Sequence, residues 1–243
     1  ISNIPFPFEV TQVEEIISLY RLGTIRNGYR TGATTFPFID VNGNVRAIQV
    51  KQFDKGNHTT GTDFLHSMIR KFLEAKGNTV PEWLNEYQQN DLKVSCLFGE
   101  HLLTKCPLNP VALVEAPKTA IYSSLYFGLP DNPKNFLWLA VYNLSSINYA
   151  KCKELQGREV YLFPDLSKDG KAFEIWTKKA KDLSVEMSGT TFIVSDLLER
   201  NGNDEQREQG YDLADYLIEL DWRLFRNIHE NNENYEPPQQ HYF

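Results

Sequence analysis

The sequence predicts an α/β fold, in which an open parallel sheet carries helices on both faces and follows a smaller α+β subdomain. Two patterns support this prediction: short continuous apolar runs alternate with helical stretches in the second half, and a hairpin lies between helices in the first. The chain has 243 residues, of which 41% are hydrophobic, enough for one large core or two modest ones. We expect an N-terminal subdomain at residues 1–95, the α/β domain at 96–226 and a polar tail at 227–243.

The N-terminal subdomain is expected to contain two helices, a hairpin between them and a linker. In chain order these elements are predicted at residues 9–22 (helix), 34–40 and 45–53 (strands), 63–76 (helix) and 82–93 (linker). Apolar residues at helical spacing predict the first helix, with Thr11 as its expected cap. The Asn42-Gly43 pair between two β-rich runs is typical of a hairpin turn.

The second half alternates between strands and helices. The expected strands are residues 111–114, 136–141, 160–163 and 191–194, and the expected helices are 118–127, 149–155, 172–183 and 213–225. Continuous apolar strands separated by helices indicate a parallel sheet that is covered on both faces. Such sheets bind ligands at the carboxyl ends of their strands, so the residues that follow each strand are the candidates for function.

The sequence lacks the patterns that characterise several classes of protein. It has no apolar run long enough to cross a membrane, no signal peptide, no P-loop and no dinucleotide-binding glycine pattern. The three cysteines, Cys96, Cys106 and Cys152, form no Cys-x-x-Cys pair, which argues against a disulfide framework and favours a reducing cytoplasm. Because the first residue is Ile1, we expect the natural protein to extend further upstream.

The net charge of −7 is unevenly distributed. Residues 1–95 carry 10 basic and 10 acidic side chains, whereas residues 96–243 carry 15 basic and 22 acidic ones. Nucleic-acid binding usually needs a basic face, so the composition counts mildly against a strong binder acting alone. Arg26, Arg30, Arg46 and Lys51, which surround the hairpin, are the candidates for nucleic-acid contact, and the alternative is an ordinary solvated strand face.

Two carboxylates follow predicted strands. Glu115 comes directly after the first apolar strand, and Asp165 follows the third in the segment Leu162-Phe-Pro-Asp165. If the carboxyl ends of these strands share one edge, the two side chains can bind a hard cation such as Mg²⁺. The alternative is that each acid merely caps the helix that follows it.

Other polar residues are expected near the same edge. Lys118 and Thr119 begin the helix after Glu115 and could bind a phosphate together with the helix N-terminus, although a solvated lysine is the simpler interpretation. Asp212 and Asp215 open the last predicted helix, where one acid is expected to cap and the other could face the cleft.

Three segments resemble motifs of the Toprim domain of bacterial DnaG-type primases. Val111-Ala-Leu-Val-Glu115-Ala-Pro-Lys118-Thr resembles the strand that ends at the motif glutamate. Leu162-Phe-Pro-Asp165-Leu-Ser167-Lys-Asp169-Gly170 is similar to the Asp-x-Asp-x-Ala-Gly motif, and Asp212-Leu-Ala-Asp215-Tyr216 to a trailing segment of the family. Thr35-Phe-Pro-Phe-Ile-Asp40 and Cys96-Leu-Phe-Gly99 also resemble segments of primases and of primase-like proteins from mobile elements.

The resemblance implies metal-dependent nucleotidyl transfer or phosphodiester chemistry on a DNA or RNA strand, with nucleotides as substrates. Glu115 and Asp165 would be catalytic and would bind Mg²⁺ or Mn²⁺. Ser167 stands at the second motif aspartate, so Asp169 would have to complete the metal site. The loop from Tyr142 to Ser146 also lacks the glycine that is usual after the second strand.

These departures keep a second hypothesis open, in which the chain is a degenerate module without efficient metal chemistry. Such a module would bind DNA or a replication partner, such as a helicase, in a mobile element. The resemblance also implies a zinc ribbon upstream of Ile1, and the lack of a long apolar run predicts no association with a membrane.

Overall fold

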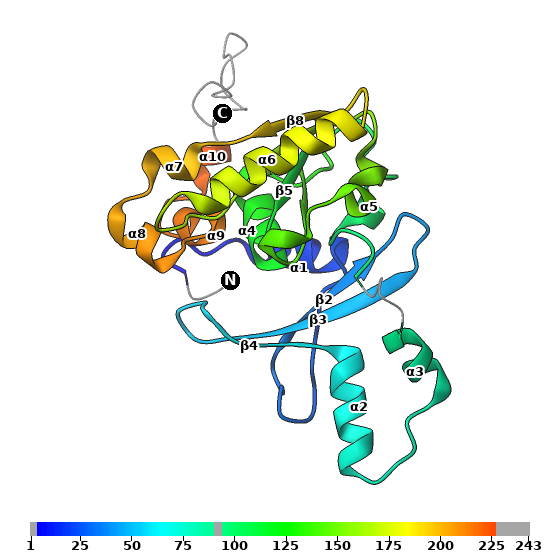
Figure 1. Cartoon of the computed structure of the whole chain (residues 1–243). Coiled ribbons are helices and arrows are strands. Elements are labelled where there is room, and N and C mark those ends of the chain that lie inside the picture. The colour runs from blue at the N-terminus through cyan, green and yellow to red at the C-terminus, as the bar shows by residue number, and fades with distance from the viewer. Residues whose placement is uncertain (1–3, 90–93, 227–243) are drawn as a thin grey trace.

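The computed structural model describes residues 4–89 and 94–226, and two four-stranded sheets organise them (Figure 1). The antiparallel sheet has the order β1-β2-β3-β4, with strands at Gly23–Thr24, Thr34–Ile39, Val45–Phe53 and Thr59–Phe64. The parallel sheet has the order β6-β5-β7-β8, and in chain order β5 to β8 span Val111–Val114, Leu137–Ala140, Glu159–Phe163 and Thr191–Val194. The predicted α/β class with a preceding α+β part is therefore confirmed.

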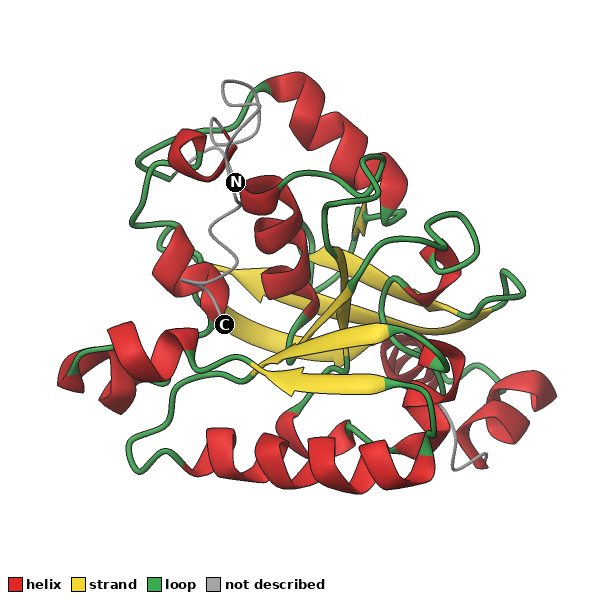
Figure 2. Cartoon of the chain, turned by 90° about the horizontal axis from the view of Figure 1, so that it is seen from above, coloured by secondary structure: helices red, strands yellow, loops and turns green. Residues whose placement is uncertain are grey.

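The parallel sheet forms because its strands are short apolar runs that must be covered on both faces. All residues of β5 and β6 are buried. The helix α6 (Lys171–Glu186) lies on one face, and α4 (Pro117–Phe127), with α1 (Val10–Leu19) beside it, covers the other (Figure 2). The four predicted strands agree with the observed ones to within one residue at each end.

The region after β8 contains more helices, and shorter ones, than the sequence predicted. The helices of this half, besides α4 and α6, are α5 (Tyr149–Cys152), α7 (Leu197–Asn201), α8 (Asp204–Gln209), α9 (Leu213–Leu217) and α10 (Arg223–Arg226). The single helix expected at 213–225 is interrupted where Trp222 turns to pack against Phe8 and donates its indole N–H to the carbonyl of Pro7 at 3.3 Å. The two helices α7 and α8 were not predicted, because their residues are mostly polar.

The predicted helix at 149–155 is also shorter than expected. Its first turn is α5, and a 3₁₀ turn over Lys153–Leu155 follows it. Asn148 caps α5, since its side-chain Oδ1 accepts the N–H of Lys151 at 3.1 Å. This short segment places Lys151 beside the end of β6.

The antiparallel half confirms the predicted hairpin and adds a strand, β4, that was not predicted. In the turn between β2 and β3, the Asp40 carboxylate accepts the N–H groups of Asn42 and Asn44 at 3.0 and 2.9 Å, and Gly43 supplies a φ of 85°. The strand β4 was missed because Thr59-Thr-Gly-Thr is polar and contains a glycine. Pairing with β3 holds Asp63 and Phe64 in this strand.

The helices of this half begin or end differently from the prediction for local reasons. The three helices are α1 (Val10–Leu19), α2 (Leu65–Ala75) and α3 (Glu82–Gln89). Thr11 lies inside α1 and does not cap it; Gln12 instead accepts the N–H of Glu9 at 3.3 Å. The stretch predicted as a linker at 82–93 is helical in α3, and its last four residues lie outside the described part of the chain.

Phe98 joins the two halves. Its backbone forms an antiparallel bridge with Ala140 of β6, and its ring lies 5.2 Å from that of Tyr20 and 5.9 Å from those of Phe36 and Phe38. One continuous cluster of buried residues therefore runs through both sheets. The boundary near residue 95 stays a prediction, and the tail at 227–243 lies outside the described residues.

In the described ranges, no helix combines the length and the apolar composition that crossing a lipid bilayer requires.

Candidate functional site

The order of the parallel strands creates a crevice at one edge of the sheet. From β5 the chain crosses to β6 on one side, and β7 then pairs with β5 on the other side. The loops that follow β5 and β7 consequently diverge, and ligands of open α/β sheets bind at such switch points. Glu115 is the first residue after β5, and Asp165 is the second after β7. The structure therefore brings together the two acids that the sequence singled out.

Glu115 does not cap α4. The cap position is Ala116, and no side-chain hydrogen bond caps the helix; the backbone N–H of Leu144, from the loop after β6, acts on the Glu115 carboxyl instead. Burial raises the pKa of Glu115; the Leu144 hydrogen bond and the charge of Lys51 oppose this shift, and the negative charge of Asp212 adds to it.

Asp165 is not a helix cap either. The N–H groups at the start of α6 are accepted by Ser167, whose Oγ lies 3.0 Å from the nitrogen of Ala172, and by Asp169. Asp165 Oδ1 is buried and has no hydrogen-bond partner among the described residues. Burial, followed by the negative charges of Asp212 and Glu115, raises the pKa of Asp165 well above its ordinary value. Such an oxygen is unusual in a folded protein and is a candidate ligand.

Lys118 is paired with two further acids. Its Nζ lies 2.8 Å from Asp215 Oδ1 and 3.1 Å from Asp212 Oδ2. Asp212 also caps α9, accepting the N–H of Asp215 at 2.9 Å, and the hydroxyl of Thr119 donates to it at 2.9 Å. Burial works to lower the pKa of Lys118, but the two carboxylates outweigh burial and raise it to about 12. Lys118 and the fully buried Thr119 thus bind the acids of α9, and their phosphate-binding role stays a prediction.

Lys51 reaches the same crevice from the antiparallel sheet. It belongs to β3, is half-buried, and its charge acts on Glu115. Burial and the charge of Lys118 lower the pKa of Lys51, while the surrounding carboxylates oppose that shift. Lys51 forms no ion pair with any residue that the structure describes, so its ammonium is available to a bound anion.

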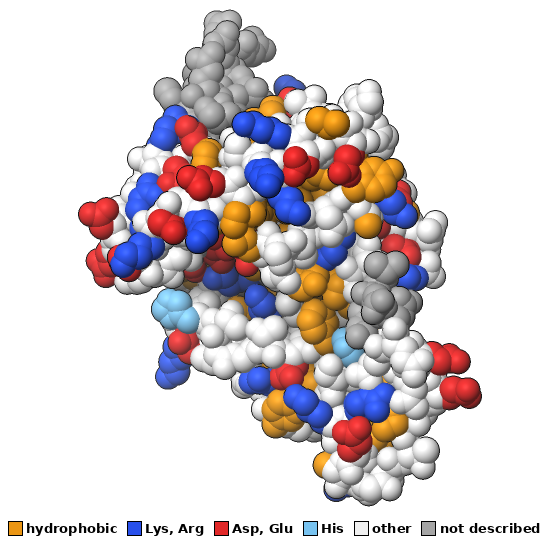
Figure 3. Space-filling view, in the orientation of Figure 1, with side chains coloured by type: hydrophobic (Ala, Val, Ile, Leu, Met, Phe, Trp, Pro, Cys, Tyr) orange, Lys and Arg blue, Asp and Glu red, His pale blue; other side chains and the backbone are white. Residues whose placement is uncertain are grey.

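Side chains of both signs gather in the hollow between the parallel-sheet part and the antiparallel sheet (Figure 3). In this cluster, the interacting groups are Glu115, Asp165, Asp212, Asp215, Lys51 and Lys118. Its four carboxyl groups outnumber its two amino groups, which favours a cation. In the described ranges, however, no three acidic, histidine or cysteine side chains are arranged as a complete metal site.

Two predicted site residues lie away from this cluster. Asp169 is exposed in the loop before α6, where its Oδ1 accepts the N–H of Lys171 at 3.3 Å. It is not among the charges that act most strongly on Asp165. Arg46 donates to Ser95 at 3.1 Å and lines a groove between β3 and the helices α2 and α3, with a volume of about 330 Å³. The structure therefore does not place Arg46 and Asp169 with Glu115 and Asp165.

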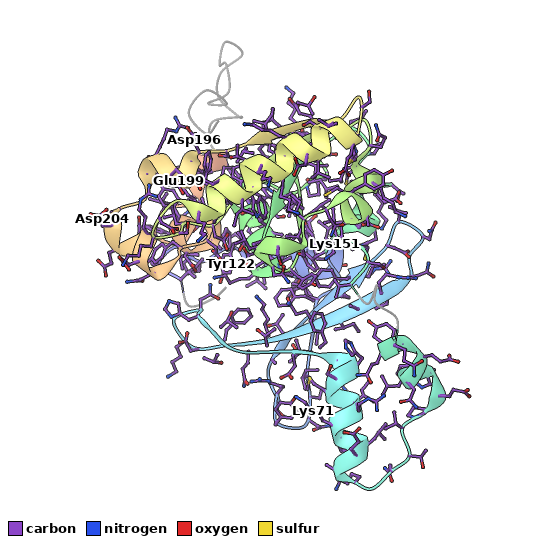
Figure 4. The ribbon with its side chains drawn as sticks, viewed as in Figure 1. Lys71, Tyr122, Lys151, Asp196, Glu199 and Asp204 are labelled. Atoms are coloured by element: carbon purple, nitrogen blue, oxygen red, sulfur yellow. The ribbon has the colours of Figure 1, made fainter. Side chains whose placement is uncertain are left out.

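Sequence reasoning missed Tyr122, which Figure 4 labels on α4. It lies one helical turn after Lys118, is buried, and has no hydrogen-bond partner for its hydroxyl among the described residues. Burial raises the pKa of Tyr122 to about 12, and the charges of Lys118 and Asp212 also act on it. The spacing of four residues from Lys118 was the signal that could have revealed it.

Comparisons with known proteins identify a family. No curated protein sequence matches this chain. The chain has weak similarity to a solved structure described as "Structure of the DnaG primase catalytic domain bound to ssDNA", with 16% sequence identity and a TM-score of 0.37, covering 93% of this chain and 67% of that one. The model of the family described as "Domain of unknown function (DUF6371)" matches residues 1–166, more than half of the sequence, and the chain therefore belongs to the DUF6371 family.

Proposed function

We propose that the chain is a Toprim-type domain that acts on the phosphate groups of a nucleic-acid strand or of nucleotides, with Mg²⁺ or Mn²⁺ bound by Glu115 and Asp165. The observation that carries the proposal is the meeting of these two acids at the switch point, with Lys51 beside them. The similarity of the Glu115 and Asp165 segments to primase motifs supports the same chemistry.

The donor groups fit a hard divalent cation. The buried Asp165 Oδ1 lacks a partner, and the cluster has two more carboxyl than amino groups. Mg²⁺ needs only one or two protein carboxylates, because it keeps several waters and takes substrate oxygens, so a complete three-residue site is not required. When bound, such a cation would neutralise charge on the phosphoryl oxygens.

The chain's own residues would orient the substrate. The unpaired ammonium of Lys51 would bind a phosphate oxygen, and its strand would place that phosphate over the crevice. The backbone N–H of Leu144 and the charge of Lys51 favour the charged form of Glu115, which is the form that binds a cation. Lys118 holds Asp212 and Asp215 in place behind the reacting groups.

A second candidate is a binding module without metal chemistry. It is favoured by Ser167, which stands where the motif has an aspartate and whose hydroxyl accepts the N–H of Ala172 in α6, and by Lys118, which pairs with two of the four acids. In that case Lys51 would still bind a strand through its phosphates. A replication helicase or another partner from a mobile element stays a prediction.

The metal site can be tested by thermal unfolding in the presence of Mg²⁺ or Mn²⁺. At ten times the dissociation constant, a specific ion stabilises the fold by about 1.4 kcal/mol, which raises the melting temperature by a few degrees. We expect Glu115→Gln and Asp165→Asn to abolish this rise. Asp169→Asn is the matched control and should retain it, because Asp169 lies outside the cluster. Equal shifts in all four proteins would exclude Glu115 and Asp165 as ligands.

Activity separates the two candidates. Primer synthesis or strand cleavage on single-stranded templates, present in the wild type and lost in Asp165→Asn, would establish the enzyme. Strand binding without either reaction, weakened in Lys51→Met and retained in Lys55→Met, would establish the module; Lys55 is exposed at the β3–β4 turn. A protein that binds no strand and no nucleotide would contradict both.

A further inference from the structure

The turn after β6 has an unusual backbone. Tyr142 adopts a φ of 93°, in the left-handed region that favours glycine and that residues with a side chain rarely occupy. Among the described residues other than glycine, only Arg21 and Asn57 share a positive φ. Contacts around Tyr142 must offset this strain.

The ring of Tyr142 is held from two sides. Phe38 of β2 and Phe64 of β4 meet it edge to face, each at 6.2 Å between ring centroids. On the other side, the Nζ of Lys151 lies 4.0 Å from the centroid of the Tyr142 ring, within the range of a cation–π interaction. The ring is therefore fixed between the antiparallel sheet and α5.

Lys151 also binds the backbone of this turn. Its Nζ donates to the carbonyl of Val141 at 3.3 Å, and the hydroxyl of Ser146 donates to the same oxygen at 3.0 Å. Lys151 is only 6% exposed and forms no ion pair with a described carboxylate. Figure 4 shows it where α5 approaches the antiparallel sheet. A buried ammonium with such partners is costly, which suggests that its position serves a purpose.

The other side of the turn contacts Glu115. The N–H of Tyr142 donates to the backbone carbonyl of Glu115 at 2.8 Å, and the backbone N–H of Leu144 works to lower the pKa of the Glu115 carboxyl. The segment from Val141 to Leu144 thus binds Lys151 through a carbonyl and a ring, and it binds the backbone of Glu115 through the N–H of Tyr142. The turn connects a buried lysine to the acid at the crevice.

We propose that Lys151 is a positioning residue for Glu115: by holding Val141 and Tyr142, it keeps the turn in the conformation in which the N–H of Tyr142 binds the backbone of Glu115 and Leu144 stays beside the Glu115 carboxylate. Lys151 does not contact the crevice acids itself. The functional importance of this role rests on the proposed function, because that proposal makes Glu115 a reacting group, but the structural connection can be measured without any activity.

The test is hydrogen exchange of backbone amides, measured by NMR in the full chain. Lys151→Met keeps the apolar stem of the side chain and removes the ammonium. We expect the amides of Tyr142 and Leu144 to exchange at least tenfold faster in this variant, because the turn is released and its contacts with Glu115 are lost. Lys153→Met, at an exposed lysine that immediately follows α5, is the matched control and should leave Leu144 unchanged.

Two further variants distinguish positioning from a general effect on the fold. Glu115→Gln should increase exchange at Leu144 while Lys151 stays in place, and Lys151→Arg, which keeps the charge, should restore much of the protection. A merely structural role would accelerate exchange equally in β5 and β7. The proposal is overturned if Leu144 keeps its protection in Lys151→Met, or if the strand amides lose theirs to the same extent.

The outcome is independent of the proposed function. If no metal binding and no reaction on nucleic acid is found, Glu115 loses its proposed role while the exchange result at Leu144 still stands. If the enzyme is active, Lys151→Met should lower its turnover more than its substrate affinity, since Lys151 does not touch substrate.

Discussion

Two buried lysines in similar positions have opposite surroundings. Lys118 lies in the first turn of α4 and is 9% exposed, and Lys151 lies in the first turn of α5 and is 6% exposed. Lys118 is paired with Asp212 and Asp215, which overcome burial and raise its pKa to about 12. Lys151 has only a carbonyl and an aromatic ring as partners, and burial lowers its pKa to about 8.

The difference shows that burial alone does not decide what a lysine contributes. Removing Lys118 would leave two carboxylates close to Asp165 without a positive charge. Removing Lys151 would leave only a neutral carbonyl and a ring. A buried charge stabilises a fold only when its removal would leave partner charges buried and unpaired, at a higher cost in free energy. Lys118 therefore stabilises the fold. Lys151 lowers the free energy of unfolding, and a positioning role would explain why it is present.

The largest expected effect is that of Lys118→Met. Breaking a buried pair from one side typically costs about 3–5 kcal/mol, and here the acids that remain already repel Asp165. We expect the free energy of unfolding, measured with urea at pH 7, to fall by this amount. Adding Asp215→Asn should recover part of the loss, because it removes one of the unpaired charges.

A small loss in Lys118→Met, below about 1 kcal/mol, would contradict the comparison. It would mean that Asp212 and Asp215 reach water or bind another cation once the lysine is gone.

Lys151→Met should instead increase the free energy of unfolding. Above pH 8 the folded chain releases the Lys151 proton, while the unfolded chain keeps it up to its ordinary pKa of 10.5. Wild-type stability attributable to this group therefore rises between pH 8 and 10.5, and below pH 8 a constant penalty remains. Removing the amine should increase the free energy of unfolding at pH 7 by about 1–3 kcal/mol, because lowering the pKa from 10.5 to about 8 corresponds to roughly 3 kcal/mol and two contacts are lost.

The measurement is a series of urea unfolding curves from pH 7 to 10, compared with Lys153→Met. The advantage of Lys151→Met over wild type should shrink as pH rises. A constant difference, or destabilisation at every pH, would show that Lys151 is stabilised by partners other than Val141 and Tyr142.

The sequence predicted much of the site because strand ends are easy to place. Val111–Val114 and Leu162–Phe163 are apolar runs, and two parallel strands must end at the same edge, so Glu115 and Asp165 were found as a pair. The capping alternative was wrong for both. Deciding against it required knowing where Leu144 and Ser167 lie, and these contacts depend on loops rather than on strand periodicity.

Other contacts depend on tertiary packing that no local pattern shows. Lys51 was predicted as a nucleic-acid contact, but its place beside Glu115 depends on how β3 packs across the crevice. The loop from Tyr142 to Ser146 lacks the glycine that is usual in the family, yet Tyr142 adopts a φ of 93°, which glycine favours. Lys151 gave no signal at all, because a lysine on a short helix normally faces solvent.

A smaller loss in the free energy of unfolding is expected for Thr119→Val, which tests the contribution of the Thr119 hydroxyl to the acid cluster. The hydroxyl of Thr119 donates to Asp212 at 2.9 Å, and a hydrogen bond to a charged group is worth about 1.5–3 kcal/mol. Because Lys118 still satisfies that carboxylate, we expect a loss near the lower end. Thr177→Val is the matched control: its hydroxyl is buried without a partner among the described residues, so valine should be neutral or stabilising. Equal effects of the two substitutions would show that Asp212 does not need Thr119.

The smallest change in the free energy of unfolding is expected for Lys168→Met, although the ion pair of Lys168 is shorter than those of Lys118. Lys168 Nζ lies 2.7 Å from Glu208, closer than Lys118 lies to either of its acids, but both side chains are more than half exposed. Water already solvates each charge, so we expect the free energy of unfolding to change by less than about 0.5 kcal/mol. A loss comparable with that of Lys118→Met would mean that distance, rather than burial, sets the value of these pairs.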